Sequence, residues 1–175
     1  MVPLIQSLIF SSKTKGCIEI NKEVNADFIN SDKKIIIMFF GYVGCSDVCT
    51  PILQDLDDLY QLQEFKKIKK DVEILFVNLT PEVQQFQPDL FAKYFNDNFN
   101  GIYLSRKETL NIDRNFGLFF SRDLSEETEL NHTDHIYLID NYSKSKVLKN
   151  IYTAHPLNRI KIINDIILLK SNKEL

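Results

Sequence analysis

The fold is decided by the stretch Asp32-Lys-Lys-Ile-Ile-Ile-Met-Phe-Phe-Gly-Tyr-Val-Gly-Cys-Ser-Asp-Val-Cys-Thr-Pro51. Its apolar run, residues 35–40, is rich in β-branched and aromatic side chains and predicts a strand that is buried on both faces. The run ends in a turn that contains two glycines. Pro51 suits the first turn of a helix, with Thr50 as its N-cap, and the apolar spacing that follows predicts a helix to about Lys70. The stretch is therefore a strand, a turn with two cysteines, and a helix.

Further strands and helices are predicted after this stretch. Strands are predicted at 72–79 and 136–139, an edge strand at 119–120, a hairpin partner at 147–152, and helices at 90–95, at 105–116 and from about 156 onwards. The resulting order, β-α-β-α-α-β-β-α, predicts the α/β class and a thioredoxin-like fold, a mixed central sheet flanked by helices on both faces. We expect a single domain overall, with its thioredoxin-like part at 33–175 and an N-terminal segment, 1–32, to which no element is assigned.

The composition excludes several classes of protein. The 175 residues suffice for one core, and 21 Lys plus Arg against 24 Asp plus Glu give a formal net charge of −3, which disfavours a nucleic-acid binder. Five glycines leave little material for a phosphate-binding loop. The longest apolar runs are shorter than the roughly 18 residues that span a bilayer, and no basic region precedes the first of them. We expect either a cytosolic protein or one whose targeting segment or anchor is not part of this sequence.

Two of the three cysteines, Cys45 and Cys49, are four residues apart in the turn between the first central strand and the first long helix. Four residues make about one helical turn, so a coiled segment would place both sulfur atoms on the same side. The positive end of a helix lowers a thiol pKa and favours the thiolate. The pair could therefore close a disulfide or hold a soft metal. Two buried cysteines without chemistry are the alternative, which their position in this turn disfavours.

His135 is the predicted third member of the site, because it immediately precedes the strand at 136–139. In a thioredoxin-like layout this strand lies beside the strand that feeds the cysteine turn. Two thiolates and one imidazole are a soft, three-coordinate set that suits copper, whereas structural zinc normally takes four protein ligands. His132 is the competitor, and we interpret it as a solvated loop residue. We interpret His155 as structural.

Two motifs of this sequence resemble the Sco/SenC family. The segment 40–49, Phe-Gly-Tyr-Val-Gly-Cys-Ser-Asp-Val-Cys, is similar to the family pattern FGYTxCPDxCP, and 133–140, Thr-Asp-His-Ile-Tyr-Leu-Ile-Asp, is similar to the pattern DHSxxxYLxD. The resemblance implies a thioredoxin fold and one copper ion per chain, Cu(I) or Cu(II), bound by Cys45, Cys49 and His135. It also implies a metallochaperone that matures the CuA site of cytochrome c oxidase subunit II.

The same resemblance sets expectations about partners and location. We expect a monomer with a copper-accepting partner protein, at the periplasmic face of the bacterial inner membrane or in the mitochondrial intermembrane space, reaching a membrane only through an anchor outside this chain. The main alternative is a thiol-disulfide oxidoreductase in which Cys45 and Cys49 are the redox-active pair, although common enzymes of that kind use C-x-x-C. A thiol peroxidase is disfavoured, because no arginine lies near the cysteine turn. We expect no turnover enzyme.

This sequence departs from the family patterns at several positions. Ser46 and Thr50 replace the prolines that usually follow each cysteine, while Asp47 is kept. The usual VDPxRD segment after the second strand is represented by 78–84, Asn-Leu-Thr-Pro-Glu-Val-Gln, which keeps the proline but loses both acids and the arginine. Cys17 has no counterpart in the family, and we interpret it as a passive thiol.

Overall fold

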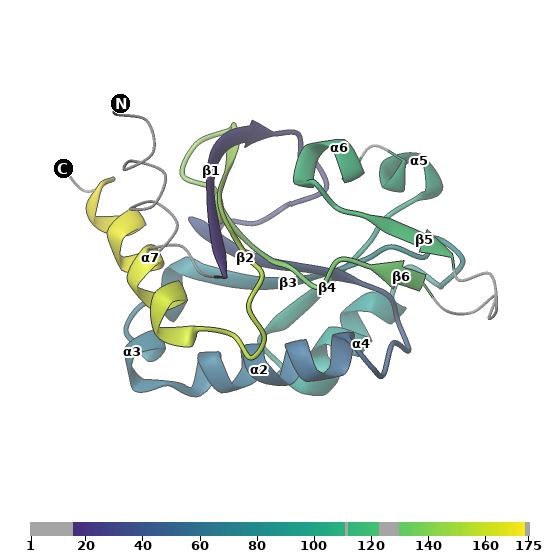
Figure 1. Ribbon diagram of the computed structural model, residues 1–175, viewed down its shortest axis with the longest axis horizontal. Coiled ribbons are helices and arrows are strands. Elements are labelled where there is room, and N and C mark those ends of the chain that lie inside the picture. Colours follow the sequence, from purple (N-terminus) through teal and green to yellow (C-terminus); the bar gives the residue numbers. More distant parts are fainter. Residues whose placement is uncertain (1–15, 111, 123–129, 174–175) are drawn as a thin grey trace, which may run out of the picture.

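The computed structural model describes residues 16–110, 112–122 and 130–173. Its centre is a six-stranded sheet in which the strands follow the order β1-β8-β7-β2-β3-β4 (Figure 1). The strands are β1 (Cys17–Val24), β2 (Ile35–Gly41), β3 (Val72–Asn78), β4 (Phe99–Tyr103), β7 (Ile136–Asp140) and β8 (Lys146–Tyr152). β2, β3 and β4 run parallel, whereas β7 and β8 form an antiparallel hairpin beside β2. The predicted mixed sheet and the position of β7 next to β2 are confirmed.

Helices cover both faces of this sheet (Figure 1). One face carries α2 (Cys49–Gln61), α3 (Gln63–Lys66), α4 (Gln87–Phe95) and α7 (Arg159–Ser171), with a 3-10 turn, η1 (Lys69–Asp71), leading into β3. The other face carries the short helices α5 (Arg106–Thr109) and α6 (Ile112–Phe116). A separate two-stranded ribbon is formed by β5 (Phe120–Arg122) and β6 (Leu130–His132). None of the helices in the described ranges is long and apolar enough to cross a membrane.

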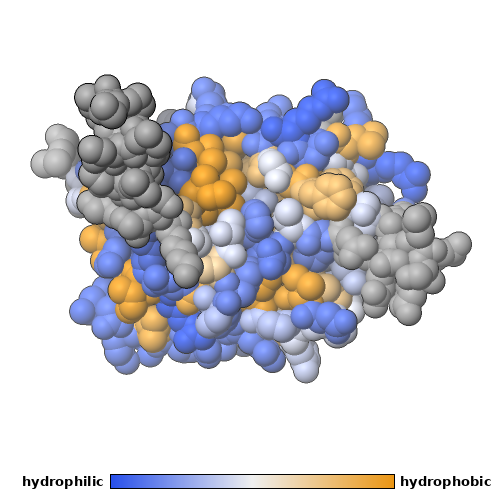
Figure 2. All heavy atoms as spheres, viewed as in Figure 1, coloured by the Kyte–Doolittle hydropathy of each residue, from blue (hydrophilic) through white to orange (hydrophobic). Residues whose placement is uncertain are grey.

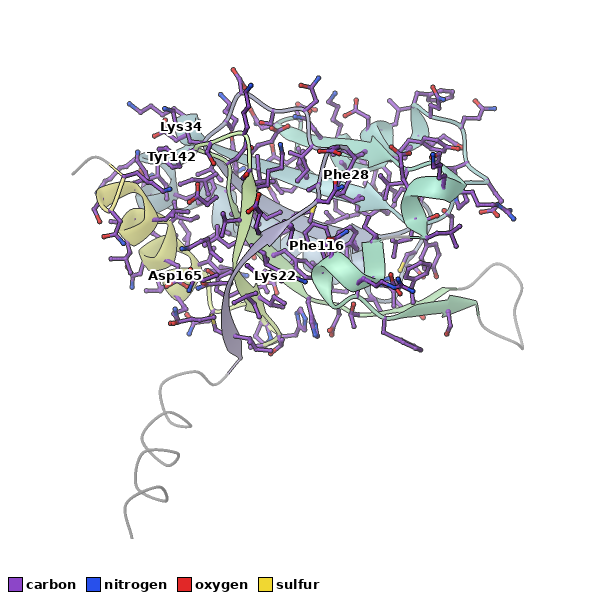
Figure 3. The ribbon with its side chains drawn as sticks, turned by 90° about the horizontal axis from the view of Figure 1, so that it is seen from above. Lys22, Phe28, Lys34, Phe116, Tyr142 and Asp165 are labelled. Atoms are coloured by element: carbon purple, nitrogen blue, oxygen red, sulfur yellow. The ribbon has the colours of Figure 1, made fainter. Side chains whose placement is uncertain are left out.

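β2 divides the core into two layers because its side chains alternate between the faces. All seven of its residues are buried, as the sequence predicts. Ile35, Ile37 and Phe39 pack with α2 and α7, and the residues between them pack on the opposite side. In that second layer Phe28, from the loop after β1, lies against Phe116 of α6 with ring centroids 6.3 Å apart (Figure 3). The cysteine turn continues from β2 and therefore opens onto the first layer.

α2 begins earlier and ends earlier than its sequence predicts. It starts at Cys49, with Val48 as a cap that makes no side-chain hydrogen bond, so Thr50 is not the N-cap. The Thr50 hydroxyl instead donates to the carbonyl of Cys45, at 3.2 Å. Pro51 still lies in the first turn, where its missing N–H costs no helical hydrogen bond. The helix ends at Gln61 because Leu62 is extended, with ψ 142°.

Two strands of the sheet escape prediction. β1 pairs antiparallel with β8 and brings residues N-terminal to position 33 into the sheet. β4 pairs with β3 and contains Gly101, a residue that weakens a strand pattern. A side chain there would overlap the backbone of Pro88, so the glycine allows α4 to pack closely against β4. α7 does not bury all of its apolar side chains: Ile160 and Ile167 are 57% and 46% exposed.

Candidate metal centre

The cysteine turn joins the end of β2 to the start of α2 and is fixed to the end of β3. The backbone N–H of Leu79 donates to the Gly41 carbonyl at 2.8 Å, and the N–H of Val43 donates to Asn78 Oδ1 at 3.0 Å. Asn78 is fully buried, and its amide also donates to the carbonyl of Thr80. Asn78, the first residue of the segment at 78–84, thus holds the turn in place with an uncharged amide.

Cys45 and Cys49 are both buried, at 4% and 0% exposure. The backbone N–H of Cys49, at the start of α2, donates to Cys45 Sγ at 3.3 Å. Hydrogen bonding from the Cys49 thiol lowers the pKa of Cys45, and backbone hydrogen bonds act in the same direction against burial. Burial raises the pKa of Cys49, and the neighbouring Cys45 sulfur raises it further. These opposite directions favour the thiolate at Cys45 and the thiol at Cys49.

His132 provides a nitrogen beside these sulfur atoms. Its Nε2 lies 3.6 Å from Cys49 Sγ, and its Nδ1 lies 2.9 Å from the carbonyl of Thr133. A carbonyl only accepts, so Nδ1 carries the hydrogen and donates it, which leaves the Nε2 lone pair of the neutral ring directed at the cysteines. The ring is held edgewise between Phe39 and Tyr42, with centroid separations of 6.0 and 5.9 Å. Such a fixed tautomer is typical of a metal-binding imidazole.

Together the ligand atoms of Cys45, Cys49 and His132 all lie within 4.8 Å of one another. Among the described residues they form the group of Cys, His, Asp or Glu side chains close enough to hold one metal ion. A metal between them could replace the proton of Cys49 and accept the lone pair of His132. Two sulfur donors and one nitrogen donor favour a soft ion such as copper.

The structure differs from the sequence-based expectation in the choice of histidine. The cysteines come together as predicted, but His132, not His135, completes the group. Strand alternation explains the difference. Ile136 faces the cysteine layer and Tyr137 faces the opposite layer, so His135 belongs with Tyr137, and their ring centroids are 6.5 Å apart. His132 ends β6, is half-buried and is not the solvated loop residue that we expected.

Motif spacing contains the signal that identifies His132. In the pattern DHSxxxYLxD the tyrosine follows the histidine by five positions. Tyr137 is five residues after His132 and only two after His135, and Thr133 matches the small hydroxyl residue of the pattern. Asn131 replaces the aspartate, whereas an aspartate does precede His135 and makes the false match attractive. The spacing is thus more informative than the Asp-His dipeptide.

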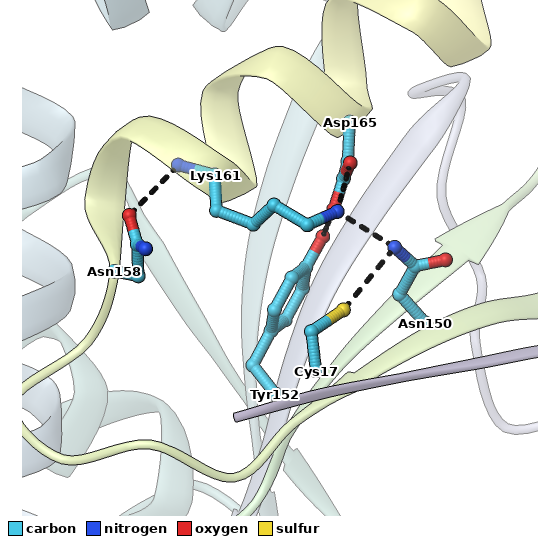
Figure 4. Close-up of polar contacts among 6 residues, drawn as sticks. All are labelled: Cys17, Asn150, Tyr152, Asn158, Lys161 and Asp165. Atoms are coloured by element: carbon cyan, nitrogen blue, oxygen red, sulfur yellow. Dashed lines mark hydrogen bonds and ion pairs between the residues drawn. The ribbon is translucent and has the colours of Figure 1, made fainter. Parts of the chain in front are cut away.

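Cys17 lies apart from this centre, in a polar network between the sheet and α7 (Figure 4). Asn150 Nδ2 is 3.6 Å from Cys17 Sγ and 2.8 Å from Asp165 Oδ2. Asp165 also accepts from Tyr152 at 2.8 Å and from Lys161 at 2.6 Å. Burial raises the pKa of Cys17, which favours the thiol over the thiolate. The network attaches α7 to β8, and its chemistry is separate from that of the cysteine pair.

The fold and the site define a class: a thioredoxin-like domain with a buried dithiol and an imidazole at the start of its first long helix. The sequence model of the SCO1/SenC family matches residues 22–167. The chain belongs to that family.

Individual relatives are distant in sequence but similar in structure. A SCO2-like protein of Rickettsia prowazekii is 23% identical over 138 residues, and the alignment covers 73% of this chain but only 64% of that protein. Apo Sco1 from Thermus thermophilus superposes with a TM-score of 0.65 at 20% identity, covering 90% of this chain and 95% of the other. Yeast Sco1, solved with copper bound, gives 0.61 at 15% identity and covers 86% and 87%. These structures support the thioredoxin-like fold.

Proposed function

We propose that this chain binds one copper ion between Cys45, Cys49 and His132 and delivers it to a copper-accepting protein. The observation that carries the proposal is the convergence of the two sulfur atoms and Nε2 within 4.8 Å. Membership of the SCO1/SenC family and the copper-bound state of yeast Sco1 support copper as the ion. The acceptor we propose is the CuA site of cytochrome c oxidase subunit II, reached from the periplasm or the mitochondrial intermembrane space.

The site suits a carrier of copper because it supplies few ligands and buries both sulfur atoms. Cys45 is poised as a thiolate, while Cys49 must lose its proton when the metal binds. Two thiolates satisfy Cu(I), whereas Cu(II) prefers more ligands and a nitrogen among them. His132 should therefore matter more for Cu(II) than for Cu(I). Three protein ligands leave room for a ligand of the acceptor to enter.

The decisive experiment compares His132→Ala with His135→Ala as a matched control. Each change removes one imidazole, and the two histidines are three residues apart, but only His132 belongs to the group with the cysteines. Each variant is titrated with Cu(I) and with Cu(II) against a competing chelator, and occupancy of the cysteine centre is read from the absorption of its copper–thiolate bonds. We expect His132→Ala to weaken Cu(II) far more than Cu(I), and His135→Ala to leave the cysteine site unchanged. Equal effects of the two substitutions would contradict the assignment of His132.

A thiol-disulfide reductase is the second candidate, because the two sulfur atoms are close and Cys45 has a lowered pKa. A low-pKa thiol at a helix N-terminus is the nucleophile of such enzymes. The copper-free, reduced protein is assayed for reduction of insulin and of a peptide with the CuA cysteines. Stoichiometric Cu(I) binding with negligible reduction supports the carrier. Rapid reduction that requires both cysteines supports the reductase.

A further inference from the structure

The two histidines outside the cysteine centre share one carboxylate. His135 Nδ1 lies 3.2 Å from Asp134 Oδ1, and His155 Nε2 lies 3.3 Å from Asp134 Oδ2. Asp134 and His135 immediately precede β7, whereas His155 lies in the loop that leads from β8 to α7. Segments separated by about twenty residues in the sequence thus place two imidazoles on either side of one acid.

This cluster is accessible and distinct from the cysteine centre. The side chains of His135 and His155 are 27% and 28% exposed, and that of Asp134 is 46% exposed. Both cysteines, by contrast, are buried. His135 belongs to the sheet face of Tyr137, opposite to the face that holds the cysteine group. An ion bound at the cluster could therefore exchange with solvent while the cysteine centre is occupied.

We infer that Asp134, His135 and His155 form a second metal site, selective for a divalent ion such as Cu(II). Imidazole and carboxylate donors suit Cu(II), whereas thiolates suit Cu(I). An ion would bind between the imidazole nitrogens and the carboxylate oxygens that now lie 3.2 and 3.3 Å apart. Metal bonds to nitrogen and oxygen are about 2 Å long, so a nitrogen and an oxygen that share an ion lie about 3 Å apart, as in each of the two pairs. For one ion to bind all three groups, the two partly exposed rings must also approach one another.

The affinity of this site should be modest. Its donor atoms are more widely spaced than those of Cys45, Cys49 and His132, which all lie within 4.8 Å of one another. Closing the cluster around an ion must therefore order three partly exposed side chains, which costs side-chain entropy. The chain would then carry two sites of different chemistry, a tight sulfur-rich one and a looser one without sulfur.

The test uses the full chain with Cys45→Ser and Cys49→Ser, so that thiolate binding and thiol oxidation by Cu(II) at that centre are removed. This protein is titrated with Cu(II), with affinity measured against a chelator and with nitrogen ligation read by electron paramagnetic resonance. We expect His155→Ala to weaken Cu(II) binding more than about tenfold, because even the loss of a residue that only hydrogen-bonds to a metal ligand weakens affinity by that factor. The electron paramagnetic resonance spectrum should also show one coordinated nitrogen fewer. His132→Ala in the same background tests whether the bound Cu(II) belongs to the cysteine centre instead. Lys107→Ala, at an exposed position of α5, is the control and should change neither measurement.

Three results would overturn the inference: no Cu(II) bound in this background, binding that survives His155→Ala, or binding that depends on His132. Circular dichroism verifies that each variant is folded, and His155→Asn replaces the alanine variant if it is not. Selective broadening of the His135 and His155 ring resonances by Cu(II) provides a second readout that needs no substitution there. Because the Cu(I) titration of the parent protein reports on the cysteine centre alone, failure of this site leaves that result intact.

Discussion

Gly41→Ala should damage the cysteine centre through a single methyl group. A Cβ at this position would lie 2.5 Å from Cys49 Sγ and 3.0 Å from a ring carbon of Phe76. Normal contact distances are about 3.5–4.0 Å, so the sulfur or the strand must move by about 1 Å. Overpacking of this kind costs about 1–3 kcal/mol of folding free energy. The metal site is more sensitive, since ligand distances tolerate deviations of only about 0.2 Å.

The assay pairs urea denaturation with a Cu(I) competition titration. We expect Gly41→Ala to lower the free energy of unfolding and to weaken Cu(I) binding. Gly117→Ala is the control, because Gly117 has φ +63° and open space around its missing side chain. That substitution strains the backbone, at a cost of about 1–2 kcal/mol, without approaching the sulfur atoms. A Gly41→Ala protein that loses stability but binds Cu(I) as the parent does would show that Cys49 is not held by the packing around Gly41.

Three further outcomes follow from the cysteines and the α7 network. The pKa of Cys45 is lower in the folded state than in the unfolded state, where it is near 8.5. Its thiolate therefore contributes its full stability above about pH 8.5 and less as the pH falls. We expect the free energy of unfolding lost in Cys45→Ser to shrink from pH 8 to pH 5, as measured by denaturant titration. Air oxidation should link Cys45 to Cys49 and abolish Cu(I) binding, and a peptide map showing Cys17 in the disulfide instead would contradict this pairing. Asp165→Ala should cost about 1–3 kcal/mol in thermal unfolding, because it leaves buried donors without an acceptor, while Cu(I) affinity stays at the parent value; a loss of Cu(I) affinity would show that the network and the centre are coupled.

The central part of the fold can be predicted from the sequence because its signals are local and strong. The run at 35–40 is apolar throughout, and a strand buried on both faces needs that pattern. β4 cannot be predicted from the sequence, because Gly101 interrupts its strand pattern. That glycine is required by the close approach of α4, which is a tertiary contact that the local sequence does not reveal. α7 is apolar around much of its circumference, so periodicity alone does not separate buried Ile163 from exposed Ile160.

The site could be predicted in part for the same reason. Cys45 and Cys49 are positioned by one continuous strand, turn and helix, so their proximity follows from short-range geometry. The histidine depends on how the ribbon of β5 and β6 folds back over the turn, and on which face of β7 each neighbouring residue meets. Both the position of the ribbon and the choice of face are determined by the tertiary structure. The sequence feature that identifies the histidine is the five-residue spacing between His132 and Tyr137.

The ligands of the centre are mounted on two different parts of the molecule. Cys45 and Cys49 belong to the turn that β2, β3 and α2 hold in place, whereas His132 ends a ribbon with its own hydrogen-bond ladder, separate from that of the six-stranded sheet. The ribbon could therefore withdraw its imidazole without breaking any hydrogen bond of the larger sheet. In the proposed delivery function, copper would pass from three protein ligands to two while the core stays still. A local movement of the ribbon would then open a coordination position for a ligand of the acceptor.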